Sequence, residues 1–347
     1  MFVPRAGLES LKPYSIEEIN WQIRLDANER PADLPPAVKN KVIERLTGLA
    51  FNRYPEISAH SLKTTIGESF GLKAANVLIG NGSSEVLAAL CFAFGGAGRS
   101  IVYPSPSFSM YGIYARLADS QPVPVELNAD FTLDADKLLA TAKKTAASVI
   151  LLCNPNNPTG TVMPQDQVEY IVANTDSLVV IDEAYHEFYG RTAVNLLQKY
   201  PHVAVARTFS KAYGLAAARV GYLLASEAIT QPLGKVLLPY SVNALTLATA
   251  ATVFGLRQEF AGSLAENSRE RARMAAALRA VPGMTVYPSQ TNFLLVKTDA
   301  AASMVARFSA SGIGVRDFSK SLGLTNCIRI GIGTPAENDA VLAAIAL

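Results

Sequence analysis

The stretch Val203–Leu224 reads VAVARTFSKAYGLAAARVGYLL, with an apolar run at each end, Val203–Ala206 and Gly221–Leu224. Between the two runs stands one lysine, Lys211, which follows a serine and precedes a small, mostly apolar segment that ends at Arg219. A lysine acts as a nucleophile only in its neutral form, which poorly solvated surroundings favour. Such a lysine can form a Schiff base with an aldehyde, whereas a lysine after a strand is more commonly solvated. The stretch alone leaves both interpretations open.

Further apolar runs precede this stretch and alternate with helical patterns. Continuous apolar strands separated by helices are typical of a mostly parallel sheet with helices on both faces. Ligands bind such sheets at the carboxyl ends of the strands. We therefore predict an α/β fold of three layers, with its large sheet built from Val77–Ile79, Ser100–Tyr103, Gln121–Val125, Ser148–Cys153, Ser177–Ile181 and Val203–Ala206.

The length of 347 residues allows about two domains. Residues 1–35 are irregular and rich in proline, so we expect an N-terminal arm rather than a domain. Residues 36–240 form the predicted large domain. Residues 241–347 form a smaller α/β domain, with strands expected at 284–287, 292–296 and 327–330 and long helices at 256–281 and from 337 onward.

Charge and composition exclude several classes of protein. The net charge is +2 and no block of Lys and Arg stands out, which argues against a nucleic-acid partner. The three histidines are scattered, so no metal site is predicted. The three cysteines are odd in number and lie in apolar contexts, which favours buried free thiols over disulfides.

One uncharged segment, Val236–Leu256, is long enough to raise the question of a transmembrane helix. It contains Pro239, Tyr240, Asn243 and several threonines, so a buried or subunit-facing helix after Pro239 is the better interpretation. The N-terminus lacks the layout of a signal peptide. We expect a cytoplasmic protein without a membrane segment.

Polar residues follow two of the predicted strands directly. The sequence NPNNPTG at 154–160 forms a rigid turn that can orient the Asn157 amide, although it is also consistent with a tight turn alone. Asp182 directly follows the next predicted strand, Ser177–Ile181, and Tyr185 follows three residues later. An acid in this position can pair with a protonated pyridine nitrogen, and the tyrosine can reach a ring oxygen. A P-loop ATPase is excluded because the glycine-rich sequence at 95–100 lacks the required lysine.

The sequence GNGSSE at 80–85 follows a predicted strand and opens a helix. A glycine turn, hydroxyl groups and a helix N-terminus together form an anion site. Glu85 occupies the third glycine position of a dinucleotide fingerprint, so this is not an NAD motif. A near-match at 331–336 is followed by only eleven residues, too few for a βαβ unit, and NAD binding is discounted.

The motifs at 157–160, 182–185 and 210–219, in this order, resemble the class I/II family of fold-type I aminotransferases, which use pyridoxal 5'-phosphate. Further segments resemble its histidinol-phosphate aminotransferase branch: LDANE at 25–29, RYPE at 53–56, GNGSSE at 80–85, FSMY at 108–111, and Arg316 and Arg329 with their neighbours. The likeness extends from about residue 12 to the C-terminus. Two positions depart from the common pattern: Ser84, where aspartate is frequent, and Ala216–Ala218, where Ala-Gly-Leu is common.

The resemblance implies a role for each matching residue. Lys211 would bind the cofactor aldehyde and shuttle a proton, Asp182 would hold the ring nitrogen, and Tyr185 and Asn157 would bind the phenolic oxygen. Phe108 would stack on the ring. The phosphate would be held by Ser83, Ser84, Ser210, Arg219 and, from the other subunit of a homodimer, Tyr54. The N-terminal arm, residues 1–35, would join the smaller domain and the dimer partner. Arg329 would bind an α-carboxylate, and Arg316 would bind the distal anion with Tyr14 and Tyr240.

These roles imply transfer of an amino group from L-histidinol phosphate to 2-oxoglutarate, in histidine biosynthesis. Two alternatives within the family share the cofactor residues: a transaminase for aromatic or other amino acids, and a threonine-phosphate decarboxylase. An alternative of another class is a non-catalytic, cofactor-binding regulatory protein. The absence of a DNA-binding module or basic tail in the sequence disfavours it.

Overall fold

The structure is a computed structural model, and it describes residues 2–3, 8, 11 and 19–346. Tyr14, which we predicted to bind substrate, lies outside the described residues. The remaining predicted site residues are all within them.

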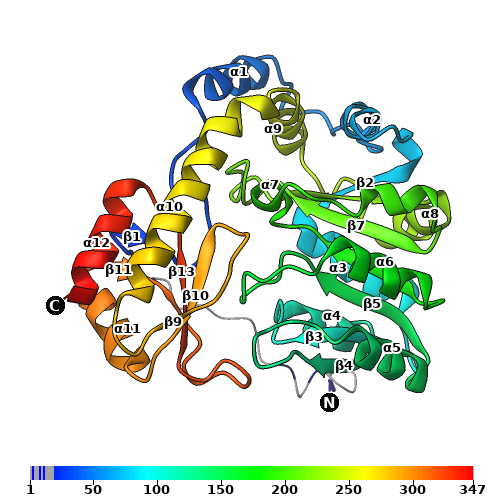
Figure 1. The fold of residues 1–347 in the computed structure, drawn as a ribbon. Helices are drawn as coiled ribbons and strands as arrows, with labels where there is room; N and C mark the ends of the chain where they lie inside the picture. The colour runs from blue at the N-terminus through cyan, green and yellow to red at the C-terminus, as the bar shows by residue number, and fades with distance from the viewer. Residues whose placement is uncertain (1, 4–7, 9–10, 12–18, 347) are drawn as a thin grey trace.

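The large sheet has seven strands in the order β2-β8-β7-β6-β5-β3-β4 (Figure 1). Only β8 runs antiparallel to its neighbours, and the residues that connect β7 to β8 form no helix that could carry the chain back for a parallel crossover. The strands are β2 Val77–Asn81, β3 Ser100–Ser105, β4 Gln121–Glu126, β5 Ala147–Cys153, β6 Leu178–Asp182, β7 Val203–Thr208 and β8 Val220–Ala225. The predicted mostly parallel sheet is confirmed.

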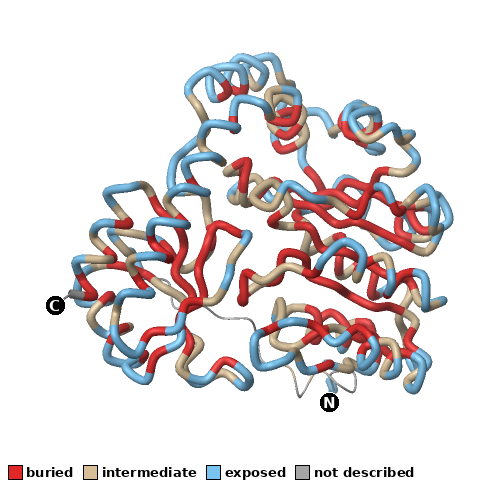
Figure 2. The backbone as a smooth tube through the Cα atoms, viewed as in Figure 1, coloured by how far each residue is buried: buried red, intermediate tan, exposed pale blue. Residues whose placement is uncertain are grey.

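Helices cover both faces of this sheet, because successive strand residues point to opposite faces and nearly all are apolar. One face packs against α1 Pro36–Thr47, α2 His60–Ser69, α5 Ala135–Lys144, α6 Gln165–Ala173 and α9 Ala244–Gly255. The other packs against α3 Gly82–Phe94, α4 Met110–Leu117 and α8 Glu227–Val236. The buried strands between these layers are evident in Figure 2. Short helical turns complete this part: η1 Ala74–Asn76, α7 His186–Tyr189 and η2 Val194–Gln198.

The C-terminal part of the chain builds a second, antiparallel sheet in the order β12-β13-β10-β9. The arm joins this part, since β1 (Ile23–Arg24) pairs in parallel with β11 (Ile313–Gly314). The remaining elements are η3 Arg257–Phe260, α10 Ala261–Arg279, β9 Thr285–Val286, β10 Phe293–Lys297, α11 Ala301–Ala310, β12 Arg316–Asp317, β13 Cys327–Gly331 and α12 Pro335–Ala346.

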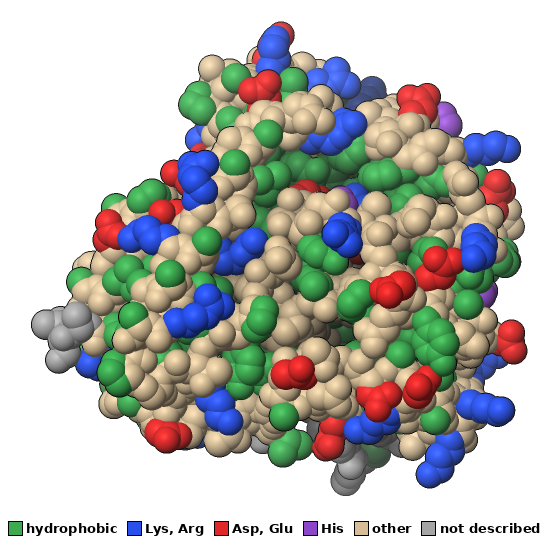
Figure 3. All heavy atoms as spheres, viewed as in Figure 1, with side chains coloured by type: hydrophobic (Ala, Val, Ile, Leu, Met, Phe, Trp, Pro, Cys, Tyr) green, Lys and Arg blue, Asp and Glu red, His purple; other side chains and the backbone are tan. Residues whose placement is uncertain are grey.

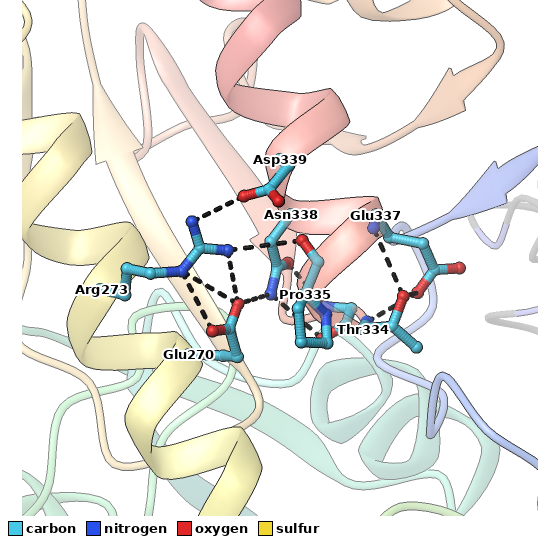
Figure 4. Close-up of polar contacts among 8 residues, drawn as sticks. Glu270, Arg273, Thr334, Pro335, Glu337, Asn338 and Asp339 are labelled. Atoms are coloured by element: carbon cyan, nitrogen blue, oxygen red, sulfur yellow. Dashed lines mark hydrogen bonds and ion pairs between the residues drawn. The ribbon is translucent and has the colours of Figure 1, made fainter.

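A cluster of hydrogen bonds and ion pairs connects α10 to the start of α12 (Figure 4). Glu270 Oε2 accepts hydrogen bonds from Arg273 Nη2 at 2.7 Å and from Asn338 Nδ2 at 2.8 Å. The fully buried Asn338 uses its Oδ1 to accept from the Gly333 amide at 2.9 Å. Because Gly333 lies just after β13, these bonds fix the end of the strand that carries Arg329.

The uncharged segment Val236–Leu256 contains the twelve-residue helix α9. This helix packs on α1 and contributes Val253 and Phe254 to the core against the large sheet. Among the described residues, no helix is long and apolar enough to cross a membrane. The division of the chain after residues 35 and 240 stays a prediction. On the face shown in Figure 3, acidic and basic side chains are interspersed.

Candidate active site

A cavity of about 690 Å³ lies at the carboxyl ends of the parallel strands. Its walls come from the ends of β5, β6 and β7, the start of α3, the arm at 26–29 and the second sheet. It brings together eleven of the residues predicted to act on cofactor or substrate: Ser83, Ser84, Phe108, Asn157, Asp182, Tyr185, Ser210, Lys211, Arg219, Arg316 and Arg329.

Lys211 follows β7 and points into poorly solvated surroundings. Its Nζ donates a hydrogen bond to the carbonyl oxygen of Ala27 at 2.8 Å. Burial, together with the positive charge of Arg329, lowers the pKa of Lys211 to about 8. A lysine with this pKa has an appreciable neutral fraction near pH 7.5, as a nucleophile requires.

Asp182 is a buried carboxylate at the end of β6. Its Oδ2 accepts from the Tyr111 hydroxyl at 2.8 Å, and its Oδ1 accepts from the Ala184 amide at 3.2 Å. Burial raises the pKa of Asp182 to about 6, although both hydrogen bonds act in the opposite direction. A desolvated acid of this kind favours a cationic partner in the cavity. The sequence predicts no role for Tyr111, although Tyr111 belongs to the FSMY segment. Its contact with Asp182 joins residues that are 71 positions apart in the chain.

Tyr185 and Asn157 are each held by one neighbour. The Tyr185 hydroxyl accepts from Asn28 Nδ2 at 2.8 Å, and Asn157 Oδ1 accepts from Arg329 Nη1 at 2.6 Å. The second bond leaves the NH₂ group of Asn157 as the donor that can serve a ligand oxygen. Asn28 was also missed as a site residue, and its place in the LDANE segment was the only signal for it.

The start of α3 and Arg219 form an anion cradle. Gly82 has φ +77°, and a Cβ at this position would lie 2.7 Å from Arg219 Nη2, so glycine permits the close approach. Arg219 Nη1 also lies 3.4 Å from Ser210 Oγ. The first turn of α3, with Ser83 and Ser84, presents backbone N–H groups that have no partner within the helix. Four of the five predicted phosphate residues, Ser83, Ser84, Ser210 and Arg219, thus line the same cavity.

Arg316 and Arg329 lie directly opposite each other on the neighbouring strands β12 and β13. Directly opposite residues of an antiparallel pair point to the same face, and like charges in such a pair repel. The ring of Phe318 lies 6.0 Å from the Arg316 guanidinium and 5.8 Å from that of Arg329. The two guanidinium groups therefore concentrate positive charge on this wall of the cavity, which would attract an anionic group.

Behind the cavity, a buried ion pair connects the strands that carry Asp182 and Lys211. Arg207 donates to Glu183 Oε2 at 2.8 Å through Nη2 and at 3.0 Å through Nε. Glu183 also accepts from the Ala193 amide at 2.6 Å. The pair therefore fixes the ends of β6 and β7 relative to each other.

Two predicted residues lie outside the cavity. Tyr54 is 82% exposed and its ring stacks on that of Tyr240, with 4.6 Å between the centroids. Their roles at phosphate and substrate stay predictions. Among the described residues, no cluster of His, Cys, Asp and Glu side chains could hold a metal ion.

Comparison with known proteins gives a consistent result. Residues 20–345 match the family model described as aminotransferase class I and II. The chain is 42% identical over 341 residues to the histidinol-phosphate aminotransferase of Thermococcus kodakarensis, covering 98% of this chain and 97% of that protein. It is 37% identical over 340 residues to the histidinol-phosphate aminotransferase of Thermoanaerobacter pseudethanolicus, covering 97% and 96%. Among solved structures, the histidinol-phosphate aminotransferase of Sinorhizobium meliloti in complex with pyridoxal-5'-phosphate has a TM-score of 0.89 and 27% identity, covering 98% of this chain and 95% of that one.

Proposed function

Because the chain belongs to the aminotransferase class I and II family, we propose that it transfers the amino group of L-histidinol phosphate to 2-oxoglutarate in histidine biosynthesis. The products are imidazole acetol phosphate and L-glutamate. The observation that carries this proposal is the pair of opposed arginines, Arg316 and Arg329, at a cavity that also holds a buried lysine and a buried acid. The names of the full-length relatives support the same substrate. We further propose that the enzyme works in the cytoplasm.

The enzyme depends on pyridoxal phosphate, and the side chains in the cavity fit this cofactor. The buried Asp182 suits a protonated ring nitrogen, and the cradle of Gly82 and Arg219 suits a phosphate. Ser83, Ser84 and Ser210 would complete the phosphate site, Phe108 would stack on the ring, and Tyr185 and Asn157 would donate to the phenolic oxygen. When bound, the cofactor withdraws electrons from the α-carbon of the substrate.

Lys211 performs the proton transfer in this proposal. Its Nζ, with a lowered pKa, would hold the cofactor through the aldehyde carbon, for which it must be a neutral amine. As a free amine, the same Nζ would accept the proton from the substrate α-carbon and donate it again to complete the amino-group transfer. The carbonyl of Ala27, which accepts from Nζ at 2.8 Å in the structure, would also accept from Nζ when it carries this proton.

The two arginines divide the anionic groups of the substrates between them. Arg329 is buried and binds the α-carboxylate of glutamate through two N–H groups. Arg316, which is partly exposed, binds the distal group, either the phosphate of histidinol phosphate or the side-chain carboxylate of glutamate. Tyr240 and Tyr14 assist Arg316 in this proposal.

Replacing Arg316 with alanine is expected to lower kcat/KM for histidinol phosphate and glutamate by about 10- to 150-fold, the effect of one hydrogen bond to a charged group. The loss for phenylalanine should be much smaller, because that side chain carries no distal anion. Steady-state kinetics on the three donors measures the difference. Arg279→Ala, at the exposed end of α10, is the matched control and should leave all three values unchanged. Equal losses on all donors would assign Arg316 a structural role.

A panel of amino donors with 2-oxoglutarate separates the proposal from its alternatives. Histidinol phosphate should give the highest kcat/KM. A higher value for phenylalanine or tyrosine would indicate an aromatic aminotransferase, and release of carbon dioxide from threonine phosphate would indicate a decarboxylase. A protein that binds the cofactor and turns over none of these donors would be a regulatory protein.

We also propose that the enzyme is a homodimer in which Tyr54 reaches the phosphate of the neighbouring site. Large apolar side chains are exposed around it: Phe51, Ile57, Leu238 and Tyr240. Such a patch favours association with a second copy. The distance of Tyr54 from the cavity of its own chain, whose walls do not include it, is consistent with this role.

Mixed dimers test whether Tyr54 acts in the site of the neighbouring subunit. A dimer of one Lys211→Ala subunit and one Tyr54→Ala subunit contains one intact site only if Tyr54 acts across subunits. Random mixing of the two inactive variants should then restore about a quarter of the wild-type activity per subunit, at a cofactor concentration that saturates only intact sites. If Tyr54 acted within its own chain, mixing would restore nothing.

A further inference from the structure

Three consecutive residues of the N-terminal arm each contact a different residue of the candidate active site. The Asp26 carbonyl accepts from Arg329, the Ala27 carbonyl accepts from Lys211, and the Asn28 side chain donates to the Tyr185 hydroxyl. The arm arrives here directly from β1, which pairs with β11 of the C-terminal part of the chain. The arm is therefore part of the site itself.

Asn28 is held firmly in this position. It is 2% exposed, and its backbone has φ +55°, a left-handed conformation that asparagine tolerates better than most residues. Its carbonyl oxygen accepts from Asn292 Nδ2 at 2.9 Å, just before β10 of the second sheet. Its Oδ1 is buried without a hydrogen-bond partner among the described residues. The uncommon backbone conformation and the unpaired oxygen both cost stability. Asn28 is nevertheless held with its amide directed toward Tyr185.

The Asn28–Tyr185 bond has a defined direction. The NH₂ group of an amide can only donate, whereas a tyrosine hydroxyl can both accept and donate, with a single proton. Because Tyr185 accepts from Asn28 at 2.8 Å, its own proton must point elsewhere. We propose that Asn28 is a positioning residue that directs the Tyr185 proton toward the phenolic oxygen of pyridoxal phosphate. This inference rests on the proposed role of Tyr185.

The visible absorbance of the Lys211-bound cofactor reports this proton directly, without turnover. When the chromophore loses its proton, the phenolic oxygen becomes more negative. A hydrogen-bond donor at this oxygen stabilises the deprotonated form and therefore lowers the pKa of the chromophore. In Asn28→Asp a carboxylate replaces the NH₂ group, and the Tyr185 proton should turn toward it. The chromophore pKa is then expected to rise by about one unit or more.

Asn28→Gly removes the amide without backbone strain, because glycine adopts positive φ readily. It should raise the chromophore pKa in the same direction. The matched control is Asn326→Gly, a position with φ +63° whose side chain donates to Asp299 and whose residue does not line the cavity. It should titrate like the wild type. The other titratable groups near Tyr185, namely Arg329, Cys153 and Asp182, are the same in all these variants.

Tyr185→Phe distinguishes failure of this inference from failure of the underlying assignment. We expect Tyr185→Phe to raise the chromophore pKa, and Asn28→Gly to cause no further rise when combined with it. If Tyr185→Phe raises the pKa while both Asn28 variants titrate like the wild type, the positioning role of Asn28 is wrong and that of Tyr185 stands. If Tyr185→Phe causes no shift, both roles are wrong.

Discussion

Replacing Lys211 with alanine is expected to abolish the visible absorbance of the bound cofactor and to lower kcat by a factor of about 10⁴ or more. Both losses would have one cause, because in the proposed reaction the same Nζ binds the aldehyde and carries the proton. The buried position of Lys211 and its pKa of about 8 suit both tasks. Absorbance spectra and steady-state kinetics on the purified variant measure the two effects.

Lys211→Arg makes this test sharper. Arginine keeps the positive charge but remains protonated at neutral pH, so it cannot become a neutral nucleophile. It should lose the absorbance as completely as alanine does. Lys235→Ala, on the exposed side of α8, is the control and should match the wild type. Retention of the visible absorbance in either Lys211 variant would show that another residue binds the cofactor.

Replacing Asp182 with asparagine is expected to lower kcat by about a hundredfold or more, because removing one partner of a buried ion pair costs about 3–5 kcal/mol. In the proposed site an amide could not neutralise the protonated ring nitrogen, so the ring would withdraw electrons less well. The visible absorbance should persist in this variant, since Lys211 is intact. Loss of the absorbance together with the activity would instead indicate that Asp182 is needed for cofactor binding itself.

The same substitution should stabilise the cofactor-free protein at neutral pH. Burial raises the pKa of Asp182 from 3.8 to about 6, so the folded state binds this proton more tightly than the unfolded state. Asp182 therefore destabilises the fold progressively as the pH rises from about 4 to 6, and fully above that range. Urea unfolding at pH 7.5 should give Asp182→Asn an advantage of up to about 3 kcal/mol, which disappears near pH 4. A less stable variant at pH 7.5 would contradict this account of the desolvated charge.

Much of the site could be predicted from the sequence because of how parallel sheets are built. Asn157, Asp182 and Lys211 lie far apart in the chain, yet each follows a buried strand. Three parallel strands, β5, β6 and β7, bring these positions to one edge of the sheet. The apolar runs revealed the strands, and strand direction placed their ends together.

Contacts between distant segments could not be predicted in this way. Asn28 and Tyr185 are 157 positions apart, and the arm that carries Asn28 shows no helical or strand periodicity. The register that places Arg316 opposite Arg329 depends on the turn between two short strands, and β12 has only two residues. The antiparallel direction of β8 could not be predicted either, because its apolar run resembles those of the parallel strands.

The function is tested most directly by a single turnover on L-histidinol phosphate in the absence of a keto acid. The proposal predicts that the visible absorbance of the Lys211-bound cofactor disappears as one equivalent of imidazole acetol phosphate forms per site, and that 2-oxoglutarate then restores it with one equivalent of glutamate. An absorbance that persists with histidinol phosphate, while threonine phosphate releases carbon dioxide, would contradict the proposed reaction.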